Sequence, residues 1–449
     1  EKESRLCVPG NTLHAALEQA RSGSEGLVRM LNDVCDRIDA CEPHIRALLP
    51  EPRRRERILA SASEVGVDCP LRGLLLGVKD IIAAAGFPTL CGSAVPPEEH
   101  GLPEEAAVVR KLKDAGMIVA GKTVTAEFAF DDAGATANPW NPLHTPGGSS
   151  SGSAAAVAAG EVHVALGTQT GGSLTRPAVF CGICGYKPSF GRISRDGVAV
   201  YSPSIDTVGL YTPDAAGMAL VGAVAVHDWN PVATKELRKL PVLGVPNGAY
   251  LRTFSRQSLD AFQEALDDLK RVGFTIHQVD GVLENIEAVR ARHLALIDSE
   301  WANSLRPQWA KYASLFRSRS AMGMVEGLAV PAEMVNEGLA GRSVLRAELE
   351  KAMDAANIDL WVTPGTIQPH APKGLERTGD MGAQLPWSHS GLPTLSLPAG
   401  LIGSEQPLPF GLQFAARFAA DEALLHWGTQ LDMLGIARTP RLRRLKELR

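Results

Sequence analysis

Hydrophobic and polar positions in the first part of the chain follow helical and then strand-like patterns. Apolar residues recur at helical spacing through residues 11–65, with a break expected at Pro43. A continuous apolar run follows at 71–82, and such a run is typical of a buried strand. Lys79 and Asp80 lie within this run, so the pattern places two ionisable side chains in an apolar setting.

The same two patterns continue through the rest of the chain. Residues 106–123 predict a helix followed by a strand, the order found in parallel sheets, and residues 283–355 are almost wholly helical. An amphipathic helix is predicted around residues 259–269, with Ser258 as its N-cap. The other expected strands and the last helix lie at 241–248, 358–365, 391–401, 408–416 and 421–434.

No internal repeat and no linker divides these elements, which predicts one large α/β unit. Within it, residues 133–215 are rich in Gly, Ser and Pro yet remain apolar, a composition that indicates buried irregular backbone rather than mobile loops. The helical segment 283–355 is the expected lid or cap of this unit. Its aromatic side chains either line a pocket beneath it or form ordinary helix-packing core; the aromatic residues are Trp301, Trp309, Tyr312 and Phe316.

Composition and charge narrow the class of protein. The 449 residues are 45% hydrophobic and 21% charged, with a formal net charge of −5, which gives no support to nucleic-acid binding. No stretch approaches the roughly 20 apolar residues that a membrane span requires. The seven cysteines, an odd number, favour free thiols in a reducing compartment, so we expect a cytoplasmic protein. The C-x-x-C at Cys181–Cys184 is interpreted as a pair of buried structural thiols.

Two Gly-Ser clusters carry the candidate chemistry, at residues 146–153 and 167–178. The first contains G-x-S-x-G at Gly148–Gly152, the pattern of a nucleophile elbow, but a proline-containing segment precedes it where an elbow needs a strand. A phosphate-binding loop would need a G-K-[ST] ending, and this cluster contains no lysine. Neither interpretation is favoured.

Lys79 is the most informative ionisable residue in the pattern. Burial lowers the pKa of a lysine, so a neutral Lys79 amine would be able to act as a base near neutral pH. The alternative is an ion pair between Lys79 and Asp80 at the end of a strand. The residues alone leave these two alternatives open.

Taken together, the motifs resemble those of the amidase signature family of serine hydrolases. The matching segments are "GVKD" (77–80), "NPWNPLHTPGGSSSGSAAAVAAG" (138–160), "GTQTGGSLTRPAVFCGICGYKPSFGRIS" (167–194), "VTP" (362–364), "GLPTLSLPAGL" (391–401) and "LPFGLQ" (408–413). They occur in the family's order and span roughly residues 30–435. The resemblance implies a single amidase domain over 1–449, with a mixed central sheet surrounded by helices. Its core is expected at 30–280 and 356–435.

The family's Lys, cis-Ser, Ser triad is carried over by motif. Lys79 matches the base, Ser149 matches the serine that follows a cis peptide bond, and Ser173 matches the nucleophile, 24 residues after Ser149. In that mechanism neutral Lys79 accepts a proton from Ser149 while Ser149 accepts one from Ser173, and Ser149 then protonates the leaving nitrogen. The backbone N–H groups of residues 170–173 (Thr170, Gly171, Gly172 and Ser173) are expected to form the oxyanion hole.

The second cluster departs from the family pattern at two positions. Gln169 stands where the family commonly has Asp, and Thr175 stands where it commonly has Arg, which suggests that a buried ion pair has been replaced by a neutral hydrogen-bonded pair. Arg176, one place later, either binds a substrate carboxylate or carbamate oxygen or bonds to backbone carbonyls within the protein. Substrate-binding roles are predicted for Arg176, Ser150 and Gln169; the alternative for Ser150, as for Ser151, is to hydrogen-bond the loop and start the helix.

The expected activity is hydrolysis of a linear C–N bond, in an amide or a carbamate, through a Ser173 acyl-enzyme. The expected partners are a small-molecule substrate and water, with no metal, cofactor, nucleic acid or membrane, and a homodimer is left open. One alternative is an amidotransferase subunit that releases ammonia from glutamine for a partner complex. Another is a non-catalytic binding protein with the same fold. Substrate identity is not decided by the sequence.

Overall fold

The computed structural model describes residues 12–403 and 407–433, and its centre is one mixed sheet of ten strands. The strand order is β2-β1-β3-β5-β4-β9-β10-β8-β6-β7. Parallel pairs at the two ends of the sheet flank antiparallel pairs in its middle. The strands span Leu75–Lys79 (β1), Ile118–Thr123 (β2), Val164–Gln169 (β3), Cys184–Lys187 (β4), Thr207–Thr212 (β5), Leu243–Asn247 (β6), Ile276–Asp280 (β7), Leu360–Pro364 (β8), Thr394–Ile402 (β9) and Leu408–Ala415 (β10).

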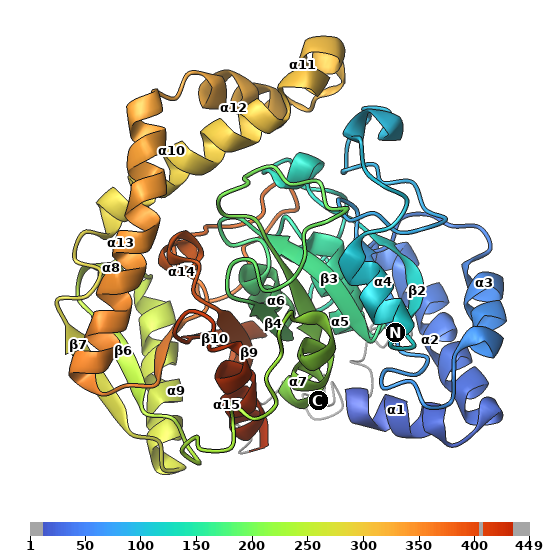
Figure 1. Cartoon of the computed structure of the whole chain (residues 1–449), viewed down its shortest axis with the longest axis horizontal. Coiled ribbons are helices and arrows are strands. Elements are labelled where there is room, and N and C mark those ends of the chain that lie inside the picture. Colours follow the sequence, from blue (N-terminus) through green and yellow to red (C-terminus); the bar gives the residue numbers. More distant parts are fainter. Residues whose placement is uncertain (1–11, 404–406, 434–449) are drawn as a thin grey trace.

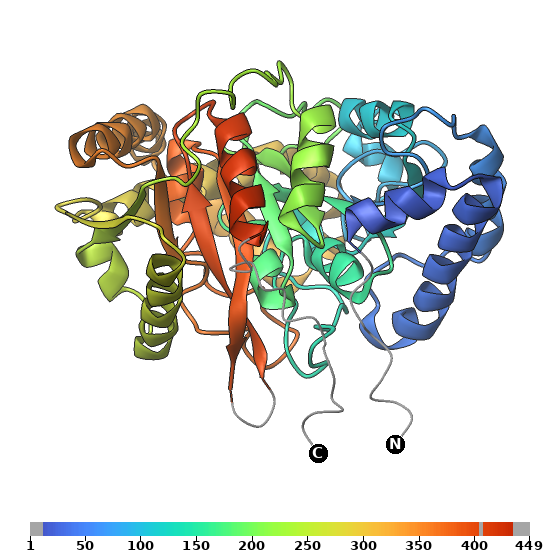
Figure 2. The same ribbon diagram turned by 90° about the horizontal axis from the view of Figure 1, so that it is seen from below.

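Helices surround this sheet, as Figures 1 and 2 show, which confirms the predicted α/β architecture. On the N-terminal side lie α1 (Leu13–Arg21), α2 (Ser24–Ile45), α3 (Arg54–Ser61) and α4 (Ala107–Asp114). Beside the central strands lie α5 (Ser151–Ala159), α6 (Thr175–Cys181), α7 (Ala215–Ala225) and α15 (Asp421–Met433). The remaining helices are α8 (Ala249–Arg252), α9 (Arg256–Arg271), α10 (Ile286–Ser304), α11 (Arg306–Tyr312), α12 (Ser318–Leu328), α13 (Ala332–Ala356) and α14 (Leu385–Ser390).

Two local predictions about helix ends were wrong. Helix α2 continues through Pro43 to Ile45 and ends at Arg46 in the left-handed conformation. The N-cap of α9 is Ser255, whose side chain accepts a hydrogen bond from the Ser258 backbone N–H, so Ser258 lies inside the helix. Proline at the C-terminal end of α2 removes only one backbone donor from a helix that buries a long apolar face, and tertiary packing there outweighs the local penalty.

The segment 283–355 forms four helices that extend away from the sheet. Helix α10 packs on both α12 and α13, and Figure 1 shows the three helices as an arm along one side of the molecule. Helix α14 contacts both α10 and α13, so this arm is joined to the body of the protein by a short helix of the core. We call α10–α13 the cap.

The sheet core explains why residues 146–194 have an apolar composition despite their glycines. Helix α5 consists of small residues, all buried, and it packs against β1, β3 and α6. At Gly152 a Cβ would lie 2.2 Å from the Ala47 carbonyl oxygen, so only glycine permits this close approach of two backbones. Small side chains therefore bring α5 into contact with the strands that carry Lys79 and the segment leading to Ser173.

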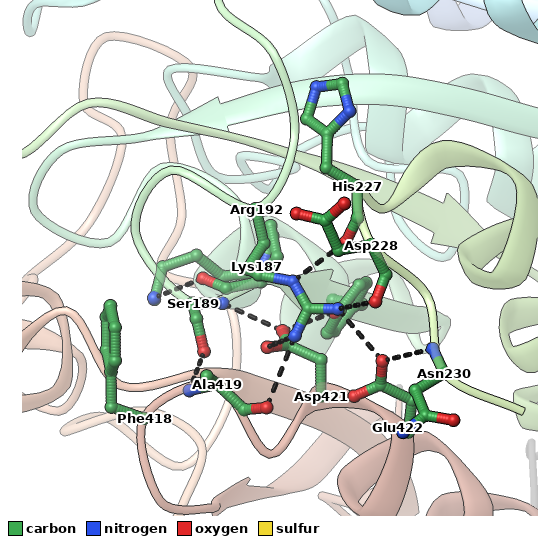
Figure 3. A network of polar contacts seen from close by, with 12 residues as sticks. Lys187, Ser189, Arg192, His227, Asp228, Asn230, Phe418, Ala419, Asp421 and Glu422 are labelled. Atoms are coloured by element: carbon green, nitrogen blue, oxygen red, sulfur yellow. Dashed lines mark hydrogen bonds and ion pairs between the residues drawn. The ribbon is translucent and has the colours of Figure 1, made fainter. Parts of the chain in front are cut away.

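A buried polar network ties the start of α15 to the loop after β4 (Figure 3). Asp421 accepts hydrogen bonds from the Tyr186 hydroxyl (2.5 Å) and the Ser189 backbone N–H (2.8 Å), and it forms an ion pair with Arg192 at 3.4 Å. Arg192 also contacts Glu422 at 2.9 Å. Lys187 donates to the Leu392 carbonyl, and burial lowers its pKa to about 7. These contacts satisfy the buried charges and fix two distant segments of the chain together.

Among the described residues no helix is both long and apolar enough to cross a membrane. The cysteines at 35, 41, 69, 91, 181 and 184 are all free thiols, and both Cys181 and Cys184 are buried, as predicted; Cys7 lies outside the described residues. Burial raises the pKa of each thiol of this C-x-x-C pair. These thiols are therefore suited to packing rather than to redox chemistry.

Candidate active site

The candidate site forms where β1, the segment before α5 and the segment after β3 meet. Lys79 is the last residue of β1, Ser149 lies two residues before the start of α5, and Ser173 follows β3. β1 and β3 are parallel neighbours in the sheet, so their carboxyl ends lie together. This arrangement brings Lys79 and Ser149, which are 70 positions apart, into hydrogen-bond contact.

Lys79 is fully buried and is bonded to two hydroxyl groups. Its side-chain nitrogen lies 2.8 Å from Ser149 Oγ and 2.7 Å from Thr168 Oγ1. Burial lowers the pKa of Lys79 to about 7, and the negative charge of Asp206 acts in the opposite direction. A large fraction of Lys79 is thus neutral near pH 7, and a neutral amine is able to accept a proton from Ser149.

Asp80 does not pair with Lys79, which rules out that alternative for the role of the lysine. The Asp80 carboxylate instead lies 3.1 Å from Lys122 Nζ, in an ion pair with both side chains buried. It also accepts hydrogen bonds from the Leu90 and Gly92 backbone N–H groups. Adjacent residues of an extended segment point to opposite sides, so Lys79 and Asp80 serve different networks.

Ser149 is held in a backbone conformation of the kind expected from the motif. The Gly148–Ser149 peptide bond is cis, and Ser149 is fully buried. The Gly148 carbonyl accepts a hydrogen bond from Arg176 Nη2 at 2.6 Å, and the Ser149 carbonyl accepts one from the Ala126 backbone N–H at 3.0 Å. The carbonyls of Gly148 and Ser149 therefore both have protein partners, which holds the backbone around the serine in place.

Ser173 lies at the wall of a large cavity. The cavity has a volume of about 1200 Å³, and the four residues Thr170, Gly171, Gly172 and Ser173 line it together with Arg176. These four residues are the ones expected to contribute backbone N–H groups to an oxyanion hole. A Cβ at 171 would lie 2.4 Å from Met381 Sδ and a Cβ at 172 would lie 2.8 Å from Gln384 Oε1, so a larger residue at either position would displace one of these side chains.

The opposite wall of the cavity comes from the cap and from the loop after β8. The cap residues that line it are Arg290, Leu294, Ile297, Asp298, Trp301, Arg319, Met322, Gly323 and Glu326. Trp301 stacks on Phe130 with ring centroids 4.3 Å apart, and its indole N–H donates to the Phe128 carbonyl. Trp309, Tyr312 and Phe316 are not among the lining residues; Trp309 and Phe316 pack on each other. The cap aromatics are thus partly pocket wall and partly core.

Arg176 bonds within the protein. Its guanidinium donates to the carbonyl oxygens of Gly379 (2.8 Å) and Gly148 (2.6 Å) and to Thr378 Oγ1 (3.1 Å), and it is almost fully buried. Of the two predicted alternatives for Arg176, the structure shows hydrogen bonding to backbone carbonyls within the protein. The arginine supports the segment that carries Ser149, although it also lines the cavity.

Ser150 and Gln169 lie behind the cavity wall, so their predicted contact with substrate is not retained. Ser150 Oγ donates to the Thr168 carbonyl at 3.2 Å, and the residue is fully buried. Gln169 Oε1 accepts hydrogen bonds from the Leu174 and Thr175 backbone N–H groups and from the Thr175 hydroxyl. The Gln169–Thr175 contact is the neutral hydrogen-bonded pair that was predicted, and it shapes the turn around Ser173.

Two groups that the sequence motifs did not single out support this turn. Asp206 accepts a hydrogen bond from the Thr170 hydroxyl at 2.5 Å and from the Tyr201 and Ser202 backbone N–H groups. Ser388 Oγ donates to the Gly171 carbonyl at 2.6 Å and accepts from Gln169 Nε2 at 2.9 Å. Both residues are far from Ser173 in sequence and stand in no motif, so only the fold identifies them.

No group of three or more potential metal ligands gathers among residues 12–403 and 407–433. His370, His389 and His426, three of the histidines downstream of the first Gly-Ser cluster, do not contact Ser149 or Ser173 in any hydrogen bond of the described structure. A nucleophile elbow with a histidine base is therefore not formed by these serines.

Comparison with known proteins agrees with this fold. Residues 29–425 match the family model described as Amidase. A glutamyl-tRNA(Gln) amidotransferase subunit of Trichormus variabilis is 31% identical, with 91% of this chain and 94% of the relative covered. A crystal structure of an amidase is 30% identical, with a TM-score of 0.82, and the match covers 94% of this chain and 99% of the amidase. Peptide amidase from Stenotrophomonas maltophilia is 25% identical, with a TM-score of 0.76, and the match covers 97% of this chain and 99% of the peptide amidase. The chain belongs to the amidase family.

Proposed function

We propose that this protein is an amidohydrolase that cleaves a linear C–N bond, in an amide or a carbamate, through an acyl-enzyme on Ser173. The observation that carries the proposal is the buried contact between Lys79 Nζ and Ser149 Oγ at 2.8 Å, next to a cavity that Ser173 lines. A buried lysine of lowered pKa, a hydroxyl bonded to it and a serine at a cavity are the parts of a serine–lysine hydrolase.

The proposed reaction assigns the attack on the carbonyl, the proton transfers and the stabilisation of charge to separate groups. Ser173 Oγ attacks the carbonyl carbon and its proton passes to Ser149, while Ser149 gives its own proton to neutral Lys79. The negative charge on the carbonyl oxygen is stabilised by the backbone N–H groups of residues 170–173. As the C–N bond breaks, Ser149 donates a proton to the leaving nitrogen and regains one from Lys79. Water then attacks the acyl-enzyme by the same proton route in reverse, and the acid is released.

The experiment that tests the proposal is hydrolysis of a small panel by the purified protein. The panel contains a p-nitroanilide, a malonamate-like monoamide and an aryl carbamate, each assayed with the unchanged protein and with Ser173→Ala. We expect at least one substrate to be turned over and Ser173→Ala to abolish that turnover. Formation of a covalent acyl adduct on Ser173, seen as a mass increase of the trapped protein, is the second readout. An active Ser173→Ala variant would overturn the assignment of the nucleophile.

A second candidate is an amidotransferase subunit that releases ammonia from glutamine. It is favoured by the relative of that name, which the chain matches over 91% of its length. The two candidates share the proposed triad and differ in substrate and in need of partners. Glutamine-dependent ammonia release that appears only with partner subunits would support the second, whereas hydrolysis of a plain amide by the protein alone supports the first.

A further inference from the structure

Two buried histidines join the cap to the core at α14. His293 lies on α10 and His389 lies on α14, and both are almost completely buried. Their Nδ1 atoms are 3.3 Å apart, and their rings meet edge to face with centroids 5.4 Å apart. Such a contact needs one Nδ1 to donate a proton and the other to accept it, so at least one of the two rings is neutral when it forms.

Helix α14 also holds the turn before Ser173. Ser388, which precedes His389, donates to the Gly171 carbonyl at 2.6 Å and accepts from Gln169 Nε2 at 2.9 Å. The Gly171 carbonyl belongs to the peptide unit whose N–H is that of Gly172. A hydrogen bond to this carbonyl therefore fixes the orientation of an N–H group that the proposed oxyanion hole uses.

The cap contacts α14 from a second side. Arg342 Nε on α13 donates to the His389 carbonyl at 3.3 Å, and Arg346 Nε donates to the Ser390 carbonyl at 2.8 Å. These are the last carbonyls of α14, which helical hydrogen bonds leave unpaired. A six-residue helix is thus held by the turn at Gly171 on one side and by α10 and α13 on the other.

Charged groups around the two imidazoles favour their neutral forms. Burial, together with the positive charges of Arg342 and Arg292, lowers the pKa of His389 to about 4. Burial, His389 and Arg342 also hold the pKa of His293 well below its usual range, while the Thr170 backbone acts in the opposite direction. Within the described residues, the Nε2 atoms of both rings have no hydrogen-bond partner. Besides the contact of His293 with the Thr170 backbone, the Nδ1–Nδ1 contact is the polar contact that orients the two rings.

We propose that His293 and His389 are positioning residues that fix the oxyanion-hole turn of residues 170–173 to the cap. The proposal rests on the proposed function, because it assigns these histidines to the Ser173 reaction. Helix α10 lines the cavity through Leu294, Ile297 and Trp301, which are neighbours of His293 on the same helix. Contacts between a substrate and the cap are then transmitted to the turn through the histidine pair and Ser388.

The test compares His293→Phe and His389→Phe with His293→Asn and His389→Asn. Phenylalanine keeps a ring of similar size and removes the Nδ1 contact, whereas the asparagine side chain places an amide group near the Nδ1 position. We expect each Phe variant to lower kcat about tenfold with KM within about twofold, because a misplaced oxyanion donor affects mainly the transition state. Each Asn variant should recover most of kcat. His14→Phe, an exposed position on α1, is the matched control and should have unchanged kinetics.

A second readout does not depend on activity. Hydrogen exchange of the backbone amides of residues 170–173 should be faster in His293→Phe than in the unchanged protein, and unchanged in His14→Phe. If hydrolysis is absent in the unchanged protein, the proposed function fails, and this exchange measurement still tests the histidine pair. Unchanged kcat and exchange in folded Phe variants, or Asn variants as slow as the Phe variants, would overturn the positioning role.

Discussion

The two walls of the cavity are built by different physical means. The wall that contains Ser173, here called the catalytic wall, is made of short segments with buried, hydrogen-bonded polar groups, and its glycines lie close to the side chains of Met381 and Gln384. The cap wall is made of helices whose cavity residues include large apolar side chains and charged groups. The first wall has little freedom to change because most of its polar groups are already paired. The second wall is able to vary, so chemistry is expected from the first and substrate choice from the second.

The largest effect should come from Lys79, which bonds to Ser149 beside the catalytic wall. Lys79→Ala should lower kcat/KM by at least about 10³-fold, because no other base among the described residues is bonded to Ser149. The measurement is steady-state hydrolysis of the substrate identified by the panel. Trp301→Phe on the cap wall is the comparison and should change KM for bulky substrates with a smaller effect on kcat. A Lys79→Ala variant that retains more than about a tenth of the activity would contradict the assigned base.

The pH dependence of activity should report the same lysine. The pKa of Lys79 is lowered to about 7, and the reaction uses the neutral amine, so kcat/KM should rise with pH through about 7 and level off above it. Asp206 favours the charged lysine, so Asp206→Asn should move this midpoint to lower pH. Steady-state rates between about pH 5 and 9 test both statements. A profile that is flat across this range would mean that a group other than Lys79 accepts the proton.

Arg176 supports the catalytic wall, and its removal should affect all substrates alike. Arg176→Ala leaves the Gly148 and Gly379 carbonyls without their donor, so we expect kcat to fall roughly 10- to 100-fold for charged and neutral amides equally. Arg176→Lys should recover little, because an ammonium does not reproduce the fork of donors. A loss confined to substrates that carry a carboxylate would show instead that Arg176 binds that group.

The smallest effect is expected far from both walls, at the buried carboxyl of Glu161. Burial and the neighbouring Glu42 raise the pKa of Glu161 well above its usual value. A carboxyl of raised pKa binds its proton more tightly in the folded state, so stability is highest at acidic pH and falls as pH rises through the folded pKa. Glu161→Gln should therefore raise the Tm at about pH 8 by a few degrees and change it less at about pH 5, with unchanged kinetics. Thermal unfolding at the two pH values checks this.

The catalytic wall was largely predictable from the sequence, and the cap wall was not. The order of the motifs placed Lys79, Ser149 and Ser173, and the structure shows the Lys79–Ser149 contact and the cis bond before Ser149. The roles of these residues stay predictions. Ser150 and Gln169 were predicted to bind substrate, but both bond within the protein, because a position in a motif does not give the direction of a side chain.

The supporting groups could not be predicted from the sequence for a simple reason. Asp206 and Ser388 bond to the turn before Ser173 from 33 and 215 residues away, and His293, 120 residues from Ser173, bonds to His389 on α14; none stands in a local pattern. The same limit applies at α2, where periodicity located the helix but the effect of Pro43 depended on packing against the rest of the chain. Local rules identify elements, whereas long-range contacts decide their ends and their neighbours.

The short helix α14 has a consequence for how this fold tolerates change in its cap. The six residues of α14 connect the cap to the turn of residues 170–173. The contacts are made by the Ser388 hydroxyl, the His389 imidazole and the carbonyl groups of His389 and Ser390. A cap exchanged for another of different shape would keep the chemistry only if it offered equivalent partners to those few atoms. Grafting experiments should therefore be designed around these contact points of α14 rather than around the length of the cap helices.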